Sequence, residues 1–491
     1  MKQTSPASVC PGCPLKDSLK ENCGVFGAYN LPSAAKPTFY GLYALQHRGQ
    51  ESAGIVSTDG RQVYSHHGIG LVSDIFSDIR TLESLKGSAA IGHNRYSTTG
   101  SGSTQNMQPF TSNFKDGFLA VGHNGNLVNT MHLRAKLVEQ GAVFNTTTDT
   151  EVILHLIARS SYSDPVDKIA DALGQVKGAY CLAILINDEL FAARDPRGYR
   201  PFSLGRVKDG WAVASETCAF DIINARFVRD IDPGEIVRIN QNGVESYKPF
   251  PSVKPQHCIF ELIYFSRPDS RVYGHSVDRI RRFFGRSLAH EHPVEGADIV
   301  ISVPDSSNSA ALGYAEESKI PLELGLIRNH YVGRTFIHPS QTVRDISTRI
   351  KYNPVREVLE GKIVVVVDDS IVRGTTSRRL IRMMRQAGAR QVHFRISSPP
   401  IRYPCFYGID MPTRSELIAS SHSIDEIKTY LRVDSLGYLS EEGLYAQTSL
   451  EAHNYCMACF NGSYEVKFEK NFHKLVYEDV QASLLDDTLL N

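Results

Sequence analysis

The stretch Ile363–Arg378, IVVVVDDSIVRGTTSR, decides the fold of the C-terminal half of the chain. Its first five residues are all β-branched, which predicts a buried strand. Asp368 and Asp369 follow directly, and Gly374 then opens a segment with helical spacing. A strand, a glycine turn and a helix in this order place free backbone N–H groups around an anion. The whole stretch therefore predicts a phosphate site, although a helix cap would explain any one of its residues.

Strand and helix patterns alternate on both sides of this stretch. Apolar runs predict strands at Asp298–Val303, Leu322–Ile327 and Val392–Ser398. Helical patterns occupy Ala311–Ser318 and Thr376–Ala389. Buried strands that alternate with helices predict an α/β domain, with a parallel sheet that is covered by helices on both faces.

The first half of the chain has a different pattern. Short β-type runs broken by glycines alternate with two helical patterns, near Thr38–Leu45 and after Thr150, which predicts an α+β domain. The runs are Ala90–His93, Phe118–His123, Tyr180–Ile186 and Trp211–Ser215. The segment Pro251–Gln256, PSVKPQ, has two prolines and no periodicity, so we expect the link between the halves around Ser252–Gln256. The predicted domains are residues 23–253 and 254–491, after a leader of residues 1–22.

The composition excludes several classes of protein. The 491 residues include 53 Lys and Arg against 53 Asp and Glu, so no basic excess exists to neutralise a nucleic-acid backbone. No run of about 20 apolar residues exists to cross a bilayer. We therefore expect neither nucleic acid nor a membrane as a partner. Nine cysteines spread through a long chain do not suit a secreted disulfide scaffold, and they predict a reducing, cytoplasmic location.

The Ile363–Arg378 stretch resembles the motif with which type I phosphoribosyltransferases bind phosphoribosyl pyrophosphate. The resemblance implies that Asp368 and Asp369 face the ribose hydroxyls and that residues 371–376 wrap the 5′-phosphate. Val303–Ala310 resembles the family's pyrophosphate loop, in which Ser306 lies near one Mg²⁺ per subunit together with the two aspartates. Asn329–Phe336 resembles its flap. The implied phosphoribosyl pyrophosphate residues are Arg334, Lys351, Asp368, Asp369, Ser370, Arg373, Gly374, Thr375 and Thr376.

Four segments after Cys23 carry a second resemblance. QHRGQESAG (46–54), GHNRYSTTG (92–100), GHNGNL (122–127) and TTTDTE (146–151) follow in the order found in class II glutamine amidotransferases. These enzymes belong to the N-terminal nucleophile hydrolases, so the resemblance implies an αββα sandwich. It also implies glutamine as a substrate.

The resemblance assigns roles to individual residues of this half. Cys23 is the nucleophile, and its own α-amino group is the base, which exists only if a propeptide of residues 1–22 is removed. Asn124 and Gly125 form the oxyanion hole. Arg95 binds the glutamine α-carboxylate and Asp149 its α-ammonium group. The remaining pocket residues that it implies are Arg48 and Thr98.

The remaining cysteines suggest a metal centre. Cys456 and Cys459 form a C-x-x-C pair, and Cys258 and Cys405 lie far upstream. These four resemble the ligands of the iron–sulfur subset of amidophosphoribosyltransferases, which implies one 4Fe-4S cluster per subunit. The spacing alone leaves a structural zinc open, because zinc uses the same ligands. The other cysteines include a second pair without an assigned role, Cys10 and Cys13, and two thiols expected in buried apolar strands, Cys181 and Cys218.

The two resemblances together imply one reaction. Ammonia from glutamine replaces pyrophosphate on phosphoribosyl pyrophosphate, giving 5-phosphoribosylamine and glutamate, the first step of purine biosynthesis. The family also implies inhibition by purine nucleotides and a homodimer or homotetramer. Two alternatives stay open. Another glutamine-dependent synthase would carry a different second half, and a phosphoribosyl-site nucleotide sensor would carry a broken nucleophile set.

Overall fold

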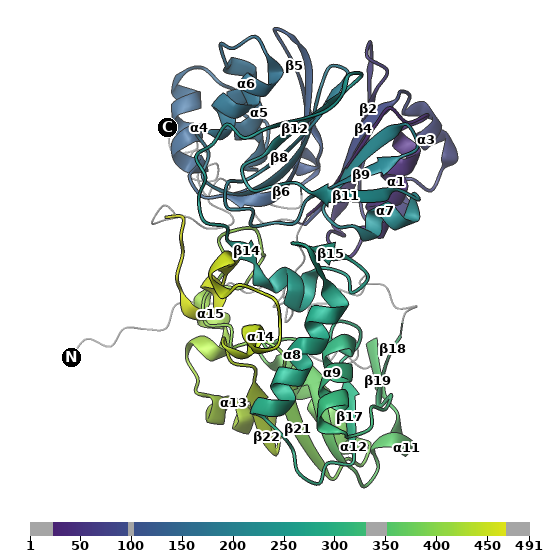
Figure 1. Ribbon diagram of the computed structural model, residues 1–491, viewed down its shortest axis with the longest axis vertical. Helices are drawn as coiled ribbons and strands as arrows, with labels where there is room; N and C mark the ends of the chain where they lie inside the picture. The colour runs from purple at the N-terminus through teal and green to yellow at the C-terminus, as the bar shows by residue number, and fades with distance from the viewer. Residues whose placement is uncertain (1–22, 97–102, 330–350, 468–491) are drawn as a thin grey trace, which may run out of the picture. The chain divides into compact units, whose positions relative to one another are not determined.

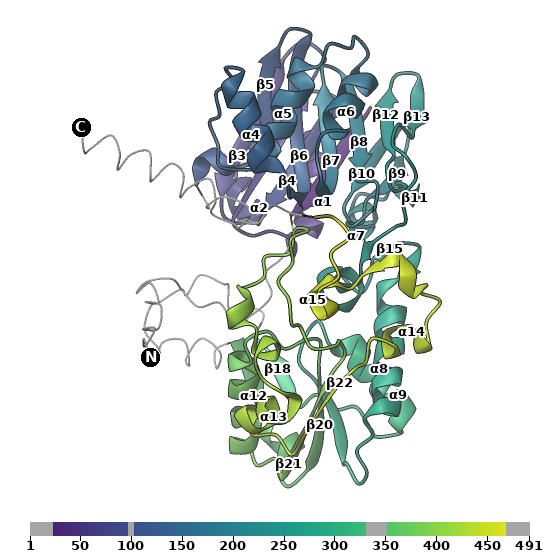
Figure 2. The same ribbon diagram turned by 90° about the vertical axis from the view of Figure 1, so that its left-hand side faces the viewer.

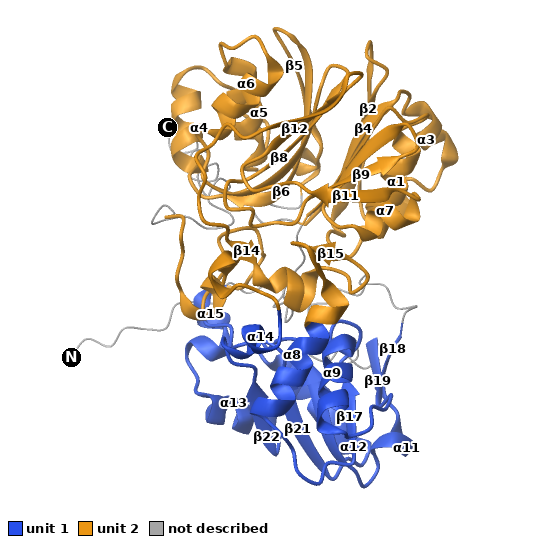
Figure 3. Ribbon diagram, in the orientation of Figure 1, with its two compact units in different colours: residues 1–19, 281–402, 413–448 blue, residues 20–280, 403–412, 449–491 orange. Residues whose placement is uncertain are grey.

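The computed structural model describes residues 23–96, 103–329 and 351–467 (Figure 1). The chain divides into two compact units, coloured separately in Figure 3. Of the described residues, the sandwich unit comprises those within 23–280, 403–412 and 449–467, and the parallel-sheet unit comprises those within 281–402 and 413–448. This division differs from a single boundary at residue 253. Backbone hydrogen bonds tie the following segment to the sandwich unit, because Gln256 N donates to Arg197 O and Cys258 N donates to Tyr199 O.

Two antiparallel sheets form the centre of the sandwich unit, in the layers that Figure 1 shows. The seven-stranded sheet has the order β11-β9-β10-β1-β4-β2-β3, and the six-stranded sheet has the order β13-β12-β8-β7-β6-β5. The first consists of β1 (Gly24–Tyr29), β2 (Ser52–Thr58), β3 (Val63–Ile69), β4 (Ala89–Arg95), β9 (Ser203–Val207), β10 (Gly210–Ala214) and β11 (Arg226–Asp230). The second consists of β5 (Phe110–Phe114), β6 (Gly117–Leu127), β7 (Gly178–Ile186), β8 (Glu189–Arg194), β12 (Ile236–Asn240) and β13 (Gly243–Tyr247).

Helices cover the outer face of each sheet. The seven-stranded sheet carries α1 (Ala35–Ala44), α2 (Val72–Ile75), α3 (Ile79–Ser84) and α7 (Cys218–Ile222). The six-stranded sheet carries α4 (Thr130–Glu139), α5 (Thr150–Arg159) and α6 (Pro165–Leu173). Apolar residues of both sheets pack against each other, among them Val25, Ile91 and Ala183, and this layer excludes water between the sheets. The predicted αββα sandwich is confirmed, but Cys218 begins a helix and does not lie in a strand.

The parallel-sheet unit has four strands in the order β17-β20-β21-β22, all paired in parallel. They are β17 (Ile299–Ser302), β20 (Ile363–Asp368), β21 (Gln391–Ile396) and β22 (Ser435–Tyr438). Figure 2 shows α8 (Val277–Glu291) and α9 (Asn308–Ser318) on one face, and α12 (Thr375–Gln386) and α13 (Ile424–Leu431) on the other. The predicted α/β domain is confirmed. The central position of β20 explains why its five β-branched residues are nearly all fully buried.

One predicted strand of this unit is mostly wrong. Leu322–Ile327 forms a strand only at its end, where β18 (Leu326–Arg328) pairs with β19 (Tyr352–Pro354). Leu322 makes a single bridge to Val300, and the Leu324 side chain is 70% exposed. The short helices α11 (Arg356–Leu359) and α14 (Gly443–Ala446) complete the unit.

The sandwich unit also contains short elements outside its two large sheets. They include β14 (His257–Cys258), a π-helical turn (Glu261–Phe265), β15 (Arg271–Val272), β16 (His275–Ser276), β23 (Tyr455–Cys456) and α15 (Ala458–Asn461). Within the described ranges, none of the helices has the length and apolar character needed to span a bilayer.

Candidate active sites

One pocket of the sandwich unit brings predicted residues together. It is lined by Cys23, Arg95, Tyr96, Gln108, His123, Gly125, Thr148 and Asp149. Four of these were predicted from the sequence: Cys23, Arg95, Gly125 and Asp149. Another, Thr98, lies outside the described residues. The four come from the start of β1, the end of β4, β6 and the start of α5, so strand pairing within each sheet and packing between the two sheets build the pocket.

The Cys23 thiol is embedded in the protein. Its Sγ donates to Tyr96 O at 3.3 Å and accepts from Tyr96 N at 3.4 Å. Burial raises the pKa of this thiol to about 11, although the Tyr96 backbone and the Arg95 guanidinium act in the opposite direction. A thiol with this pKa is neutral near pH 7. The nucleophile therefore needs a nearby base to take its proton.

Asp149 is an anion held inside the pocket. Its Oδ2 accepts from Leu127 N at 2.9 Å, and its Oδ1 lies 3.7 Å from His123 Nδ1. Burial acts to raise the pKa of this carboxyl, but His123 and the Leu127 N–H lower it below its ordinary value. A buried carboxylate that stays charged can bind an ammonium group. Sequence reasoning missed His123 and Gln108, although His123 stands inside the quoted GHNGNL segment.

Asn124 and Gly125 lie on β6 beside the nucleophile. Gly125 has φ +153°, and a Cβ on it would lie 2.0 Å from Ala179 O, so only glycine fits. The Asn124 Nδ2 makes a long hydrogen bond of 3.4 Å to Ser215 Oγ, and its Oδ1 is buried without a partner. A side-chain amide that makes so few hydrogen bonds within the protein can form one to a ligand.

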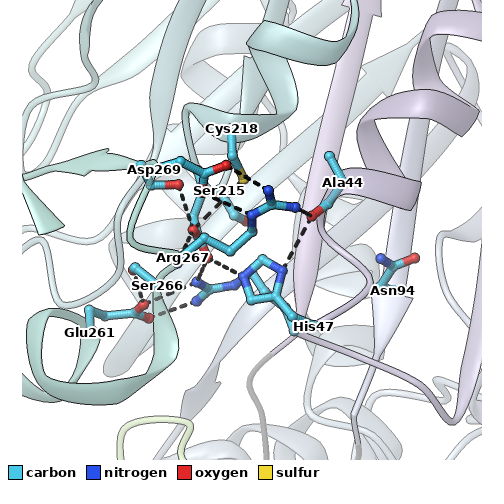
Figure 4. A network of polar contacts seen from close by, with 12 residues as sticks. Ala44, His47, Asn94, Ser215, Cys218, Glu261, Ser266, Arg267 and Asp269 are labelled. Atoms are coloured by element: carbon cyan, nitrogen blue, oxygen red, sulfur yellow. Dashed lines mark hydrogen bonds and ion pairs between the residues drawn. The ribbon is translucent and has the colours of Figure 1, made fainter. Parts of the chain in front are cut away.

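Arg48 anchors the backbone of the nucleophile through a buried network of charges. Its Nε donates to Cys23 O at 3.2 Å, while its terminal nitrogens donate to Glu216 and, bidentately, to Glu261. Arg200 donates to the same Glu261 at 3.3 Å. Figure 4 shows Glu261 with Ser266, whose hydroxyl donates to it, and His47 close by. The network satisfies each buried charge, as buried ion pairs require.

The candidate site of the parallel-sheet unit lies where β17 and β20 end. Ser302 pairs with Val367 in this sheet, so the loops that follow both strands lie at the same edge. The predicted magnesium residues meet there: Ser306 Oγ donates to Asp369 Oδ2 at 2.6 Å, and Ser307 Oγ donates to Asp368 Oδ1 at 3.2 Å.

The carboxyl groups of Asp368 and Asp369 are harder to ionise than ordinary aspartates. Burial, together with the charge of Asp369, raises the pKa of Asp368 well above its ordinary value. Burial also raises the pKa of Asp369, against the hydroxyls of Ser306 and Ser370. A bound cation or hydroxyl donors would stabilise the charged form of two such carboxyls. Mg²⁺ commonly uses one or two protein carboxylates with substrate phosphates and water, so the donor set fits it.

The loop after β20 is prepared for an anion. Gly374 caps α12 with φ +75°, which leaves the first N–H groups of the helix facing the loop. Thr375 Oγ1 and Arg373 Nε are both buried without a hydrogen-bond partner. The Arg373 guanidinium is held by Glu416 Oε1. These two buried donors without partners, one in the loop and one at the first residue of α12, could bind the predicted phosphate.

Other predicted residues of this site are less closely tied to it. Lys351 is exposed, and its Nζ lies 5.0 Å from the centroid of the Tyr352 ring. Arg334 lies outside the described residues. Sequence reasoning missed Arg328, which pairs with Asp305 of the pyrophosphate-loop candidate, and buried Arg281, whose charge acts on Asp369.

The four predicted cluster ligands converge in the sandwich unit. Cys258 and Cys456 are register partners in the β14–β23 pair, and Tyr403 N donates to Cys459 O. Burial raises the pKa of Cys459 well above its ordinary value, and the charges of Cys456, Cys258 and Cys405 add to this effect. Among the described residues, no three His, Cys, Asp or Glu side chains are arranged around a single ion. Four mutually interacting thiols fit a cluster, in which each thiolate binds a different iron.

Comparison with known proteins places these sites in a class. A family model described as a glutamine amidotransferase domain matches residues 93–221, which include most of the Cys23 pocket. The chain thus carries a glutamine amidotransferase domain of the N-terminal nucleophile hydrolase fold, joined to a phosphoribosyltransferase-type domain.

Whole-chain relatives make the class specific. The chain is 50% identical to amidophosphoribosyltransferase from Bacillus subtilis over 91% of its own length and 94% of the relative's. It is 50% identical to the chloroplastic amidophosphoribosyltransferase 1 of Arabidopsis thaliana over 91% and 79%. A solved structure of glutamine phosphoribosylpyrophosphate amidotransferase from B. subtilis, complexed with ADP and GMP, has a TM-score of 0.87 at 49% identity and covers 92% of this chain and 99% of its own. The chain belongs to the amidophosphoribosyltransferase family.

Proposed function

We propose that the chain hydrolyses glutamine at Cys23 and transfers the ammonia to phosphoribosyl pyrophosphate, giving 5-phosphoribosylamine, pyrophosphate and glutamate. This reaction is the first step of purine biosynthesis. One observation carries the proposal: a single chain of this family combines the Cys23 pocket with a sheet edge that has paired carboxyls and orphaned phosphate donors.

In the first half-reaction, the Cys23 Sγ attacks the side-chain carbonyl carbon of glutamine. The α-amino group of Cys23 takes the thiol proton and passes it to the leaving ammonia. The Asn124 amide and the Gly125 N–H stabilise the oxyanion of the tetrahedral intermediate. Water then cleaves the thioester and releases glutamate. Arg95 and Asp149 hold the α-carboxylate and α-ammonium groups of the substrate, and Thr98 supports them.

In the second half-reaction, the ammonia lone pair attacks the anomeric carbon while its bond to pyrophosphate breaks. Asp368 and Asp369 orient the ribose hydroxyls, and residues 371–376 hold the 5′-phosphate. Ser306, Asp368 and Asp369 would hold Mg²⁺, which neutralises charge on the pyrophosphate when it is bound. We further propose that Lys351 and Arg334 contact the phosphates.

Two maturation steps belong to the proposal. Removal of residues 1–22 frees the amine of Cys23, and the raised pKa of the thiol is the reason that this base is needed. Cys258, Cys405, Cys456 and Cys459 would hold one 4Fe-4S cluster, which ties the C-terminal segment to the sandwich unit. The thiolates of such a cluster suit the reducing cytoplasm that the cysteine pattern predicts.

Regulation and assembly also belong to the proposal. The B. subtilis enzyme was solved with ADP and GMP bound, so we propose that purine nucleotides inhibit this chain at its phosphoribosyl site. We further propose a homodimer or a homotetramer.

The test measures glutamate release and phosphoribosylamine formation, with and without phosphoribosyl pyrophosphate, on protein purified anaerobically. We expect phosphoribosylamine formation to depend on both substrates. Intact mass and metal analysis should show the loss of residues 1–22 and about four irons per chain. A chain that binds nucleotides but never releases glutamate would instead be a sensor. Zinc in place of iron would contradict the cluster alone.

A further inference from the structure

A segment that follows Cys405 in the sequence lies against the oxyanion turn, defined as residues 124–126. We call this segment, residues 406–408, the brace. A Cβ added to Gly408 would lie 2.9 Å from the Gly125 carbonyl carbon and 3.1 Å from its Cα and its oxygen. Asn126 Nδ2 donates to Phe406 O at 3.0 Å. The brace therefore touches the turn both by close backbone packing and by a hydrogen bond.

Strand β7 also packs closely against the turn. Gly125 and Asn126 are the register partners of Tyr180 and Ala179. Ala179 O leaves no room for a side chain on Gly125, as the 2.0 Å approach of an added Cβ shows. With both β7 and Gly408 packed against it, the Gly125 backbone has little freedom to tilt, since packed backbone atoms deform very little.

The brace is itself fixed by the buried charge network. Arg200 donates to Tyr407 O from Nε at 3.2 Å and from its terminal nitrogen at 2.8 Å. The rings of Tyr407 and Tyr199 stack with centroids 4.4 Å apart. Arg200 also pairs with Glu261, which holds Arg48. The same network thus restrains the brace and, through Arg48, the backbone of the nucleophile.

We propose that the brace is a positioning element for glutamine hydrolysis and that Gly408 is a positioning residue, which holds the Gly125 peptide where the oxyanion forms. The inference rests on the proposed function, because it takes Gly125 as an oxyanion donor. Such a donor stabilises charge that exists only near the transition state. Displacing the turn therefore lowers kcat and leaves KM for glutamine nearly unchanged.

The test compares two glycines with similar backbones. Gly408 has φ +102° and Gly243 has φ +115°, but nothing lies within 4 Å of a Cβ added to Gly243. Gly408→Ala should lower the glutamine-driven kcat at least about tenfold, because loss of one oxyanion donor costs about a hundredfold or more. Its rate with ammonium as the nitrogen source should stay within about twofold of wild type, because that reaction bypasses the oxyanion hole. Gly243→Ala should leave both rates unchanged.

A second variant covers the case in which Gly408→Ala does not fold. Asn126→Ala removes the bond to Phe406 without backbone strain, and it should also lower the glutamine-driven kcat while sparing the ammonium-driven rate. Equal glutamine-driven kcat values in wild type and both variants would overturn the inference, as would an equal loss with both nitrogen sources. A wild-type chain that never hydrolyses glutamine would contradict the proposed function itself.

Discussion

The Cys23 pocket and the C-terminal edge of the parallel sheet differ in how well their polar groups are satisfied without a ligand. Behind the pocket, Arg48 has carboxylate partners for its terminal nitrogens, and within it Asp149 has a lowered pKa, although the Asn124 Oδ1 beside the nucleophile lacks a partner. At the sheet edge, Arg373 Nε and Thr375 Oγ1 lack partners, and the carboxyls of Asp368 and Asp369 resist ionisation. The pocket is built before its substrate arrives, whereas the sheet edge is completed by its ligand.

If the two sites act separately, a substitution in one site should abolish only the reaction of that site. Cys23→Ala should lower glutamine-driven phosphoribosylamine formation at least about a thousandfold, because it removes the nucleophile. Ammonium-driven formation should stay within about twofold of wild type, since it needs only the sheet edge. Steady-state rates with each nitrogen source measure both effects. Cys218→Ala, a change at another buried thiol, is the control and should spare both reactions.

The preorganised pocket should also depend on its charge network for stability. Glu261→Gln removes the carboxylate charge that the buried guanidinium groups of Arg48 and Arg200 share. The free energy of unfolding should therefore fall by about 3 kcal/mol. Trp211, the single tryptophan, lies on β10 and reports the denaturant-induced unfolding of the sandwich unit.

Glu235→Gln is the matched control for that variant. Glu235 is also fully buried and pairs bidentately with an arginine, but the side chain of its partner Arg229 is 37% exposed. Water can solvate Arg229 when the carboxylate is lost, so the control should lose only about 1 kcal/mol. Equal losses in the two variants would mean that the Arg48 network adds no special stability.

The contrast between the sites also explains what sequence could predict. The sheet edge comes mainly from one contiguous stretch, so a strand, two acids and a glycine turn predicted its fold and its ligand class together. The pocket residues were found because each stands in a short recognisable segment. The network behind them was missed, since Arg48 meets Glu216 and Glu261 across 168 and 213 residues, and neither glutamate stands in a local pattern.

Tertiary packing also set two features that local patterns misjudged. The apolar run Leu322–Ile327 predicts a strand, yet apart from the single bridge of Leu322 to Val300, pairing begins only at Leu326, with β19. The segment of residues 403–412 lies between β21 and β22 of the parallel sheet in sequence but packs in the sandwich unit. Its hydrogen bonds to Arg200 and Asn126 fix that choice, and no periodicity of its own encodes them.

The orphaned donors of the sheet edge should be sensitive to geometry. Arg373→Lys keeps the charge but removes the planar fork and the free Nε, so KM for phosphoribosyl pyrophosphate should rise about tenfold. Arg378→Lys is the control, because Arg378 lies on α12, which follows the loop that carries Arg373, and stacks over the Tyr430 ring. It should leave KM unchanged. Initial rates with ammonium isolate the effect from the glutamine pocket.

The last prediction concerns the acid pair in the ligand-free protein. A raised pKa means that folded Asp368 keeps a proton which the unfolded chain releases above about pH 4. Its contribution to the free energy of unfolding is therefore present at low pH and is lost as pH rises toward the folded-state pKa. Relative to Asp368→Asn, wild type should lose about 1 kcal/mol for each unit by which the pKa is raised. Denaturant unfolding of both proteins across this pH range, followed by circular dichroism, measures the difference. Mg²⁺ with phosphoribosyl pyrophosphate should abolish this difference, since the bound cation favours the charged pair. If the free energies of unfolding of the two ligand-free proteins changed equally with pH, the pKa of Asp368 would not be raised by folding.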